Sequence, residues 1–364
     1  MQRKMMALAV SMCLFLAPRA FGQSDAQSGT SSADSSLETL NISSKPNLPR
    51  GKSMPYLPGD YRESITVDGM VRTYLLHIPY AYNARKDYPL VLGFHGGGGT
   101  GAKFAQQTDF RVYADKEGFI AVFPDGIEHN WNDGRDSTDA YELGVNDVKF
   151  VRILVEHLKS KLRIDAFRVY AAGVSNGGFF SHRLGCEAAD IFTAIGVDVA
   201  AMPTNMVSKC NPVKPVSLVA IQGTVDPFIP INGGDTKHKT LGIGDGGLTE
   251  SAWRTMELWA SKNGCRARPV ITKLPARVHD GTSVTGYEYK NCRGDSAMNY
   301  YIVDGMGHNW PPNEPGREKE RIVGPTSKNI DATKVFWEFF EHLQKRNKYY
   351  NPPREHVPRI RRTY

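Results

Sequence analysis

The amino-acid sequence predicts an α/β domain built around a mainly parallel sheet, with helices on both faces. Short apolar runs alternate with segments of helical periodicity, which is the rhythm of βαβ units. The runs are almost wholly apolar, as expected of strands that are buried on both faces. The 364 residues are 40% hydrophobic and 23% charged, which is an ordinary globular composition and argues against a disordered or fibrous protein.

The predicted elements begin with a hairpin. Residues 65–67 and 71–78 flank the dipeptide Asp68-Gly69, which favours a tight turn between two strands. Apolar runs predict further strands at residues 90–94, 119–123, 169–172, 194–199, 216–221 and 300–303. Helical spacing predicts helices at residues 148–162 (capped by Asn146 or Asp147), 249–262 and 332–343.

The net charge of +7 lies at the two ends of the chain. Residues 1–22 carry +3 and residues 345–364 carry +6, which leaves −2 for the residues between them. Phosphate recognition needs a basic face on the folded domain itself. The charge distribution therefore argues against nucleic acid as a partner.

Residues 1–22 are predicted to be a secretory signal peptide. Arg3 and Lys4 precede an apolar run, and Ala20 and Gly22 supply the small residues of a cleavage site. The run is short for a bilayer span, so an uncleaved anchor is the less favoured alternative and no transmembrane segment is expected. The protein is therefore expected to be secreted or periplasmic.

Three further regions follow the signal segment. We expect a flexible Ser-rich leader over residues 23–50, a catalytic α/β domain over 51–345 and a basic tail over 346–364. The tail is either a solvated extension or a contact for an anionic surface.

Four cysteines remain beyond the signal segment, and an even number in an exported protein indicates disulfides. They allow three pairings, of which we favour the two local ones, Cys186 with Cys210 and Cys265 with Cys292. Their spacing is unlike that of zinc ligands.

The strongest local motif is Gly-Val-Ser-Asn-Gly-Gly at residues 173–178. It follows a short apolar strand and precedes a helix-compatible stretch, which is the context of a nucleophile elbow. The flanking residues must be small because the sharp turn brings backbone close to backbone. We therefore interpret Ser175 as a nucleophile rather than as part of a plain glycine turn.

A second motif, His95 followed by four glycines, ends an earlier strand. In esterases such a loop supplies one N–H group of the oxyanion hole, and the residue after the serine supplies another. These donors are predicted to be Gly97 and Asn176. A phosphate loop is excluded because no Gly-Lys-Ser/Thr follows. His95 itself is interpreted as structural.

The acid and base of a triad are expected after the serine, in that order. Asp226 follows a strand-end glycine by three residues, which places it at the carboxyl edge of the sheet. Asp198, within an apolar strand, and Asp235, in a glycine-rich loop, are weaker candidates. His308 lies on the loop after the last predicted strand and is the candidate base. Proton transfer through these groups requires no cofactor and no metal.

Five ordered motifs between about residues 61 and 343 resemble the secreted polyhydroxybutyrate depolymerase and feruloyl esterase family. They are His-Gly-Gly at 95–97, Trp-Asn-Asp-Gly-Arg at 131–135, Gly-Val-Ser-Asn-Gly-Gly at 173–178, Gly-Thr-Val-Asp-Pro at 223–227 and Gly-His-Asn-Trp-Pro at 307–311. The resemblance implies an α/β-hydrolase fold and an exported serine esterase. It assigns the nucleophile to Ser175, the acid to Asp226 and the base to His308.

The sequence departs from the family at two places. Four glycines run together after His95, where family members often carry another residue. Residues 235–248 look like an insertion beside the acid loop that could shape the acyl pocket. Trp131 and Trp310 are candidates for stacking on an aromatic acyl group or a sugar, with core packing as the alternative.

The favoured function is hydrolysis of feruloyl or related esters of plant cell-wall polysaccharide, so the expected partner is an ester substrate. Polyester depolymerisation is the alternative among esterases, although no polymer-binding domain is visible in the remaining length. A serine peptidase uses the same triad. A non-catalytic polymer-binding protein would have no use for the ordered Ser175, Asp226 and His308.

Overall fold

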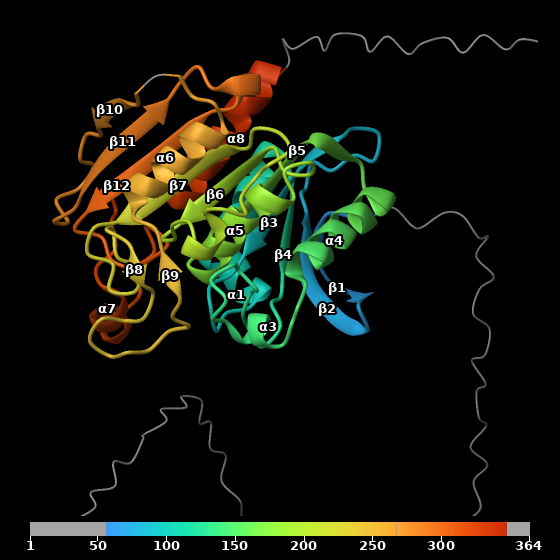
Figure 1. Ribbon diagram of the computed structural model, residues 1–364. Helices are drawn as coiled ribbons and strands as arrows, with labels where there is room; N and C mark the ends of the chain where they lie inside the picture. Colours follow the sequence, from blue (N-terminus) through green and yellow to red (C-terminus); the bar gives the residue numbers. More distant parts are fainter. Residues whose placement is uncertain (1–55, 267, 348–364) are drawn as a thin grey trace, which may run out of the picture. The chain divides into compact units, whose positions relative to one another are not determined.

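The structure, a computed structural model, describes residues 56–347 except Ala267. Its centre is a ten-stranded sheet with the order β1-β2-β4-β3-β5-β6-β7-β12-β11-β10 (Figure 1). The six adjacent strands from β4 to β12 run parallel, and the outer strands pair antiparallel at both edges. The predicted mainly parallel α/β architecture is confirmed.

The strands of this sheet are β1 (Gly59–Val67), β2 (Met70–Ile78), β3 (Tyr88–Phe94), β4 (Ile120–Pro124), β5 (Ile164–Val174), β6 (Ala194–Asp198), β7 (Ser217–Gly223), β10 (Val270–Lys273), β11 (Ser283–Tyr289) and β12 (Met298–Asp304). A small separate sheet consists of β8 (Gly234–Asp235) and β9 (Leu248–Thr249). The helices are α1 (Gly101–Gln107), α2 (Phe110–Glu117), α3 (Asp139–Glu142), α4 (Asp147–Lys161), α5 (Asn176–Glu187), α6 (Ala252–Lys262), α7 (Arg317–Val323) and α8 (Ala332–Asn347).

The predicted hairpin is present as β1 and β2. Val67 pairs with Met70 across the turn, and the turn residues Asp68 and Gly69 have φ angles of 50° and 78°. A two-residue hairpin turn of type I′ needs positive φ at both positions, which Asp and Gly adopt more readily than other residues.

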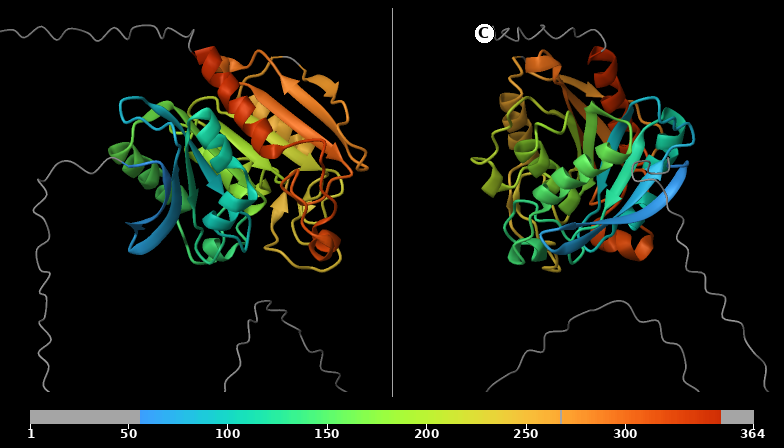
Figure 2. Two further views of the ribbon diagram at one scale, coloured as in Figure 1. Left: turned by 180° about the vertical axis from the view of Figure 1, so that it is seen from behind. Right: turned by 90° about the vertical axis from the view of Figure 1, so that its right-hand side faces the viewer.

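The sheet is buried on both faces. Alternate residues of β3 enter different cores, with Leu90 and Leu92 in one and Val91 in the other. The first core contains side chains of α4, α5 and α6, and the second contains side chains of α1, α2 and α8. Figure 2 shows α8 lying across the sheet on the face opposite to α5 and α6 of Figure 1.

The structure differs from the prediction in the start of one helix and in several elements that the sequence analysis did not predict. The helix predicted from residue 249 begins at Ala252, because Thr249 belongs to β9 and the Ser251 hydroxyl caps the helix by accepting the N–H of Arg254. The sequence analysis also missed the strands β8 to β11 and the helices α1, α2, α3 and α7. All four residues of β10 are exposed, so this edge strand has no apolar run that could mark it.

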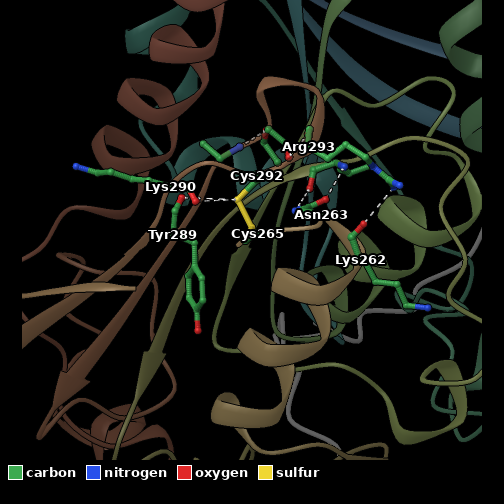
Figure 3. The surroundings of a disulfide bond; sticks show 11 residues. Lys262, Asn263, Cys265, Tyr289, Lys290, Cys292 and Arg293 are labelled. Carbon is green, nitrogen blue, oxygen red and sulfur yellow. Dashed lines mark hydrogen bonds between the residues drawn. A yellow bond between two sulfur atoms is a disulfide. The ribbon is translucent and has the colours of Figure 1, made fainter. Parts of the chain in front are cut away.

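Both predicted disulfides are present. Cys186–Cys210 joins α5 to a loop after β6, and both of its cysteines are buried. Cys265–Cys292 joins the end of α6 to the segment before β12 (Figure 3). Beside it, the N–H of Arg293 donates to the carbonyl oxygen of Asn263 at 2.8 Å. The second disulfide therefore reinforces a contact that the backbone already makes.

Removing either disulfide is expected to lower the free energy of unfolding by roughly 3 kcal/mol, because each bond closes a loop of about two dozen residues in the unfolded chain. Thermal unfolding of the Cys186→Ala/Cys210→Ala and Cys265→Ala/Cys292→Ala variants measures the two effects separately. An unchanged melting temperature in both double variants would contradict this prediction.

The predicted signal peptide over 1–22, the leader over 23–50 and nearly all of the tail over 346–364 lie outside the described residues. Of the helices within residues 56–347, none has the length and apolar character needed to cross a membrane.

Candidate active site

Ser175 lies on a sharp turn between β5 and α5, at the carboxyl edge of the sheet. Its backbone has φ 55° and ψ −121°, a conformation that residues other than glycine rarely adopt. A Cβ atom on Gly173 would collide with the carbonyl oxygen of Gly177, and one on Gly177 with that of Phe94. Close backbone approach therefore explains the glycines around the serine.

Asp226 and His308 lie on the loops that follow β7 and β12, two adjacent parallel strands. Oδ2 of Asp226 lies 2.8 Å from Nδ1 of His308. The other oxygen, Oδ1, accepts the backbone N–H groups of Phe228 and Ile229, both at 2.8 Å. Both oxygens of the Asp226 carboxylate therefore have hydrogen-bond partners that fix its orientation. It can accept the Nδ1–H of His308, which leaves Nε2 as the basic nitrogen of the ring.

Ser175 and His308 line the same cavity, which has a volume of about 480 Å³. Small-molecule sites typically have volumes of about 300–1,000 Å³. The cavity wall includes the glycine loop after β3 and the half-buried Phe228, whose ring centre lies 5.1 Å from that of His308. The structure therefore brings the candidate nucleophile and base to one cavity, with Asp226 bonded to the base. Residues 56–347 contain no group of three or more His, Cys, Asp or Glu side chains suited to a metal ion.

The glycine loop packs against the turn that carries the serine. A Cβ atom on Gly96 would lie 3.4 Å from Cβ of Ser175, and one on Gly97 would lie 3.9 Å from Cβ of Asn176. Among the described residues, the backbone N–H groups of Gly97 and Asn176 have no hydrogen-bond acceptor. Both donors are therefore free to bind an anionic oxygen formed at the serine.

His95 is buried beneath this loop. Its Nδ1 lies 2.8 Å from the carbonyl oxygen of Gly96, and its Nε2 accepts the N–H of Gly126 at 3.0 Å. Burial lowers the pKa of His95 to about 4, so the ring is neutral at neutral pH. His95 therefore joins the loop after β3 to the loop after β4.

Buried polar side chains support Asn176. Its side-chain amide donates to the carboxylate of Asp133 at 2.7 Å. Arg135 binds Asp133 through Nε at 2.8 Å and Asp245 through Nη2 at 3.0 Å. Burial opposes the charge of Arg135, but the two carboxylates together raise its pKa. The sequence analysis noted residues 131–135 only as a motif and did not foresee this network.

The segment 235–248, which looks like an insertion, contributes to the cavity wall through Thr236, Gly244 and Asp245. His238 attaches the segment to α7, because its Nε2 lies 3.0 Å from the carbonyl oxygen of Ile322. Figure 1 shows β8 and β9 at the base of the segment, beside α7.

The two tryptophans pack in the core instead of forming an exposed aromatic surface. Trp131 is fully buried, with its ring stacked on Phe180 and its indole N–H donated to the carbonyl oxygen of His95. Trp310 borders the cavity but is only 1% exposed, and it donates to the Thr333 hydroxyl. Stacking of a substrate on these rings is therefore not supported, and the alternative of core packing is what the structure shows.

The two weaker candidates for the acid lie in different surroundings. Asp235 is exposed in β8. Asp198 is completely buried at the end of β6, and its two carboxyl oxygens have no hydrogen-bond partner among the described residues. Burial, reinforced by the negative charge of Asp226, raises the pKa of Asp198 well above its usual value. Asp198 therefore keeps its proton in the folded protein at pH values where it would be ionised in the unfolded chain.

Replacing Asp198 with asparagine is expected to stabilise the protein increasingly as the pH rises above about 4. Between the pKa of the unfolded chain and the raised pKa of the folded protein, the unfolded chain releases the proton that the folded protein retains, so the stability of the wild type falls by about 1.4 kcal/mol per pH unit relative to the variant. Chemical unfolding of both proteins at pH 4, 5, 6 and 7 measures this difference. A difference that does not depend on pH would contradict the raised pKa.

Comparison with known proteins identifies several relatives. Residues 72–213 match the family model described as esterase PHB depolymerase. NocK of Nocardia uniformis subsp. tsuyamanensis, named an esterase by inference, is 28% identical over 76% of this chain and 80% of its own length. Feruloyl esterase B of Piromyces equi is 28% identical over 65% of this chain but only 42% of its own length. Feruloyl esterase C of Emericella nidulans is 27% identical over 74% of this chain and 83% of its own length.

Proposed function

We propose that this chain, an α/β-hydrolase whose residues 72–213 match the family model of the PHB depolymerase esterases, hydrolyses carboxylic esters by a serine mechanism. The proposed triad consists of Ser175 as nucleophile, His308 as general base and Asp226 as acid. The observation that carries the proposal is the 2.8 Å contact between His308 and Asp226, beside a cavity that Ser175 also lines.

In the first half of the proposed reaction, Nε2 of His308 takes the hydroxyl proton of Ser175 while Oγ attacks the ester carbonyl carbon. The carbonyl oxygen becomes an oxyanion, which the N–H groups of Gly97 and Asn176 stabilise. One such donor contributes about 3–4 kcal/mol in comparable sites. The tetrahedral intermediate collapses when His308 returns the proton to the leaving alcohol, and the acyl group remains on the serine.

Water completes the reaction by the same route. His308 takes a proton from the water as its oxygen attacks the acyl carbon, and then gives that proton to Oγ of Ser175 as the acid leaves. Throughout both halves, Asp226 accepts the Nδ1–H of His308 and stabilises the imidazolium that forms. The residues named here supply every proton transfer.

We propose feruloyl esters of plant cell-wall polysaccharide as the substrates. Two relatives are named feruloyl esterases, and one of them aligns over 83% of its own length. The half-buried ring of Phe228 at the cavity wall offers an apolar surface for a planar hydroxycinnamoyl group. Polyester depolymerisation is the second candidate, because the matching family model is that of the PHB depolymerases.

Hydrolysis of methyl ferulate and clearing of a polyhydroxybutyrate suspension, measured side by side, distinguish the two candidates. Release of ferulate without clearing supports the feruloyl assignment, and clearing without release supports the polyester assignment. A fluorophosphonate probe that labels the wild type but not Ser175→Ala tests the serine mechanism independently of the substrate. Failure to label the wild type would contradict that mechanism.

We also propose that the protein is exported, because residues 1–22 have the pattern of a signal peptide and the fold contains two disulfides. The N-terminal sequence of the protein recovered outside the cytoplasm is expected to begin at Gln23. Recovery of the full-length chain from the cytoplasm alone would contradict export.

A further inference from the structure

Arg135 and Asp245 are two of the charged side chains that line the cavity, and they differ in how many of their hydrogen-bonding atoms already have a partner in the protein. Arg135 is only 4% exposed, and the five N–H donors of its guanidinium can all be paired. Its partners are Asp133, the Thr236 hydroxyl, the carbonyl oxygen of Gly246 and Asp245. Arg135 therefore has no donor left for a ligand.

The carboxylate of Asp245 uses only one of its two oxygens for hydrogen bonds within the described residues. Its Oδ2 binds Nη2 of Arg135 at 3.0 Å, whereas Oδ1 has no hydrogen-bond partner among the described residues. The side chain is 28% exposed and lines the cavity. Arg135 thus fixes the carboxylate by one oxygen and leaves the other as an acceptor for a group outside the protein.

The position of this acceptor limits which part of a substrate could reach it. Oδ2 of Asp245 lies 3.4 Å from the place that a Cβ atom on Gly97 would occupy, so the carboxylate lies beside the proposed oxyanion hole. The phenolic hydroxyl of a feruloyl group is at the far end of the acyl chain. A sugar esterified through one hydroxyl carries other hydroxyls only a few bonds from the ester oxygen.

We propose that Asp245 accepts a hydrogen bond from a hydroxyl of the alcohol half of the ester, and that it selects esters of sugars over esters of simple alcohols. The inference rests on the proposed esterase function and names the substrate class of the same site. A carboxylate makes a stronger hydrogen bond with a hydroxyl than a neutral acceptor does. Internal units of a polyhydroxyalkanoate lack a free hydroxyl, so the preference would also disfavour polyesters.

The test compares two esters of one acid, the feruloyl ester of a pentose and methyl ferulate. In Asp245→Asn the amide oxygen can keep the bond to Arg135, and the amide nitrogen then replaces the free carboxylate oxygen. We expect kcat/KM for the pentose ester to fall at least tenfold more than kcat/KM for methyl ferulate, mainly through a higher KM for the pentose ester. Asp245→Ala should give the same pattern. Asp235→Asn is the matched control, because Asp235 lies in the same segment but outside the cavity wall. This variant should leave kcat/KM unchanged for both esters.

An equal fall for both esters in the Asp245 variants, or no fall for either, would overturn the proposal, because neither result depends on the sugar hydroxyls. If the wild type does not cleave methyl ferulate, the feruloyl assignment fails. The Asp245 comparison then proceeds with the pentose ester and methyl ester of whichever acid the enzyme does release. The two proposals therefore fail in distinguishable ways.

Discussion

Replacing Ser175 with alanine is expected to reduce kcat for ester hydrolysis by on the order of a million-fold, because no acyl-enzyme can form without Oγ. The fold should be unaffected. The Ser175 hydroxyl has no hydrogen-bond partner within residues 56–347, so its removal leaves no buried group unpaired. An alanine at position 175 has to adopt the same positive φ of 55° as the serine, so the substitution does not change what the backbone demands of this residue. Steady-state hydrolysis of methyl ferulate and thermal unfolding measure the two effects.

The matched control is Ser160→Ala, which removes an exposed serine hydroxyl near the end of α4, from a residue that does not line the cavity. It should retain wild-type kcat. If Ser175→Ala unfolds well below the wild-type melting temperature, Ser175 has a structural role that the proposed mechanism omits. If Ser175→Ala is as active as Ser160→Ala, Ser175 is not the nucleophile.

Much of the fold was predictable because buried parallel strands leave a strong local pattern. Residues 90–94 and 194–199 are continuous apolar runs, and they became β3 and β6 within a residue or two at each end. β10 and β11 lie at the edge of the sheet, where exposure on one side removes that pattern. α1 and α2 have only seven and eight residues, too few for helical periodicity to stand out.

The candidate triad was predictable for a different reason. Ser175, Asp226 and His308 each follow a strand of the parallel block, and the carboxyl ends of parallel strands meet at one edge of the sheet. Chain order and strand position were therefore enough to select them. The hydrogen bond between Asp226 and His308 joins residues 82 positions apart, and no local pattern could supply its geometry.

Contacts that depend on packing could not be predicted. Arg135 and Asp245 are 110 residues apart, and only the folded chain shows that one guanidinium links the side chains that support Asn176 to the segment 235–248.

Trp131 and Trp310 were open to two interpretations, because an aromatic residue next to a catalytic motif is compatible with both a binding surface and a core position. Their exposure, 0% and 1%, decides in favour of the core.

Replacing Asp226 with asparagine is expected to lower kcat by on the order of ten-thousand-fold without disturbing the fold. The hydrogen bonds of the wild type determine how the amide of the asparagine must be oriented. Oδ1 accepts two backbone N–H groups, from Phe228 and Ile229, so only the oxygen of an asparagine amide can occupy that position. The amide nitrogen must then face Nδ1 of His308.

An N–H donor at that place forces Nδ1 to act as an acceptor and moves the ring proton to Nε2. With Nε2 protonated, His308 cannot take the proton of Ser175, although every atom remains close to its original place. Kinetics of Asp226→Asn against Asp198→Asn measure the effect, because both changes replace a buried carboxyl of the same edge by an amide. Asp198→Asn should keep kcat within a few-fold of the wild type. The opposite ranking of the two variants would assign the acid to Asp198, since only the carboxylate bonded to the catalytic imidazole can control which ring nitrogen carries the proton.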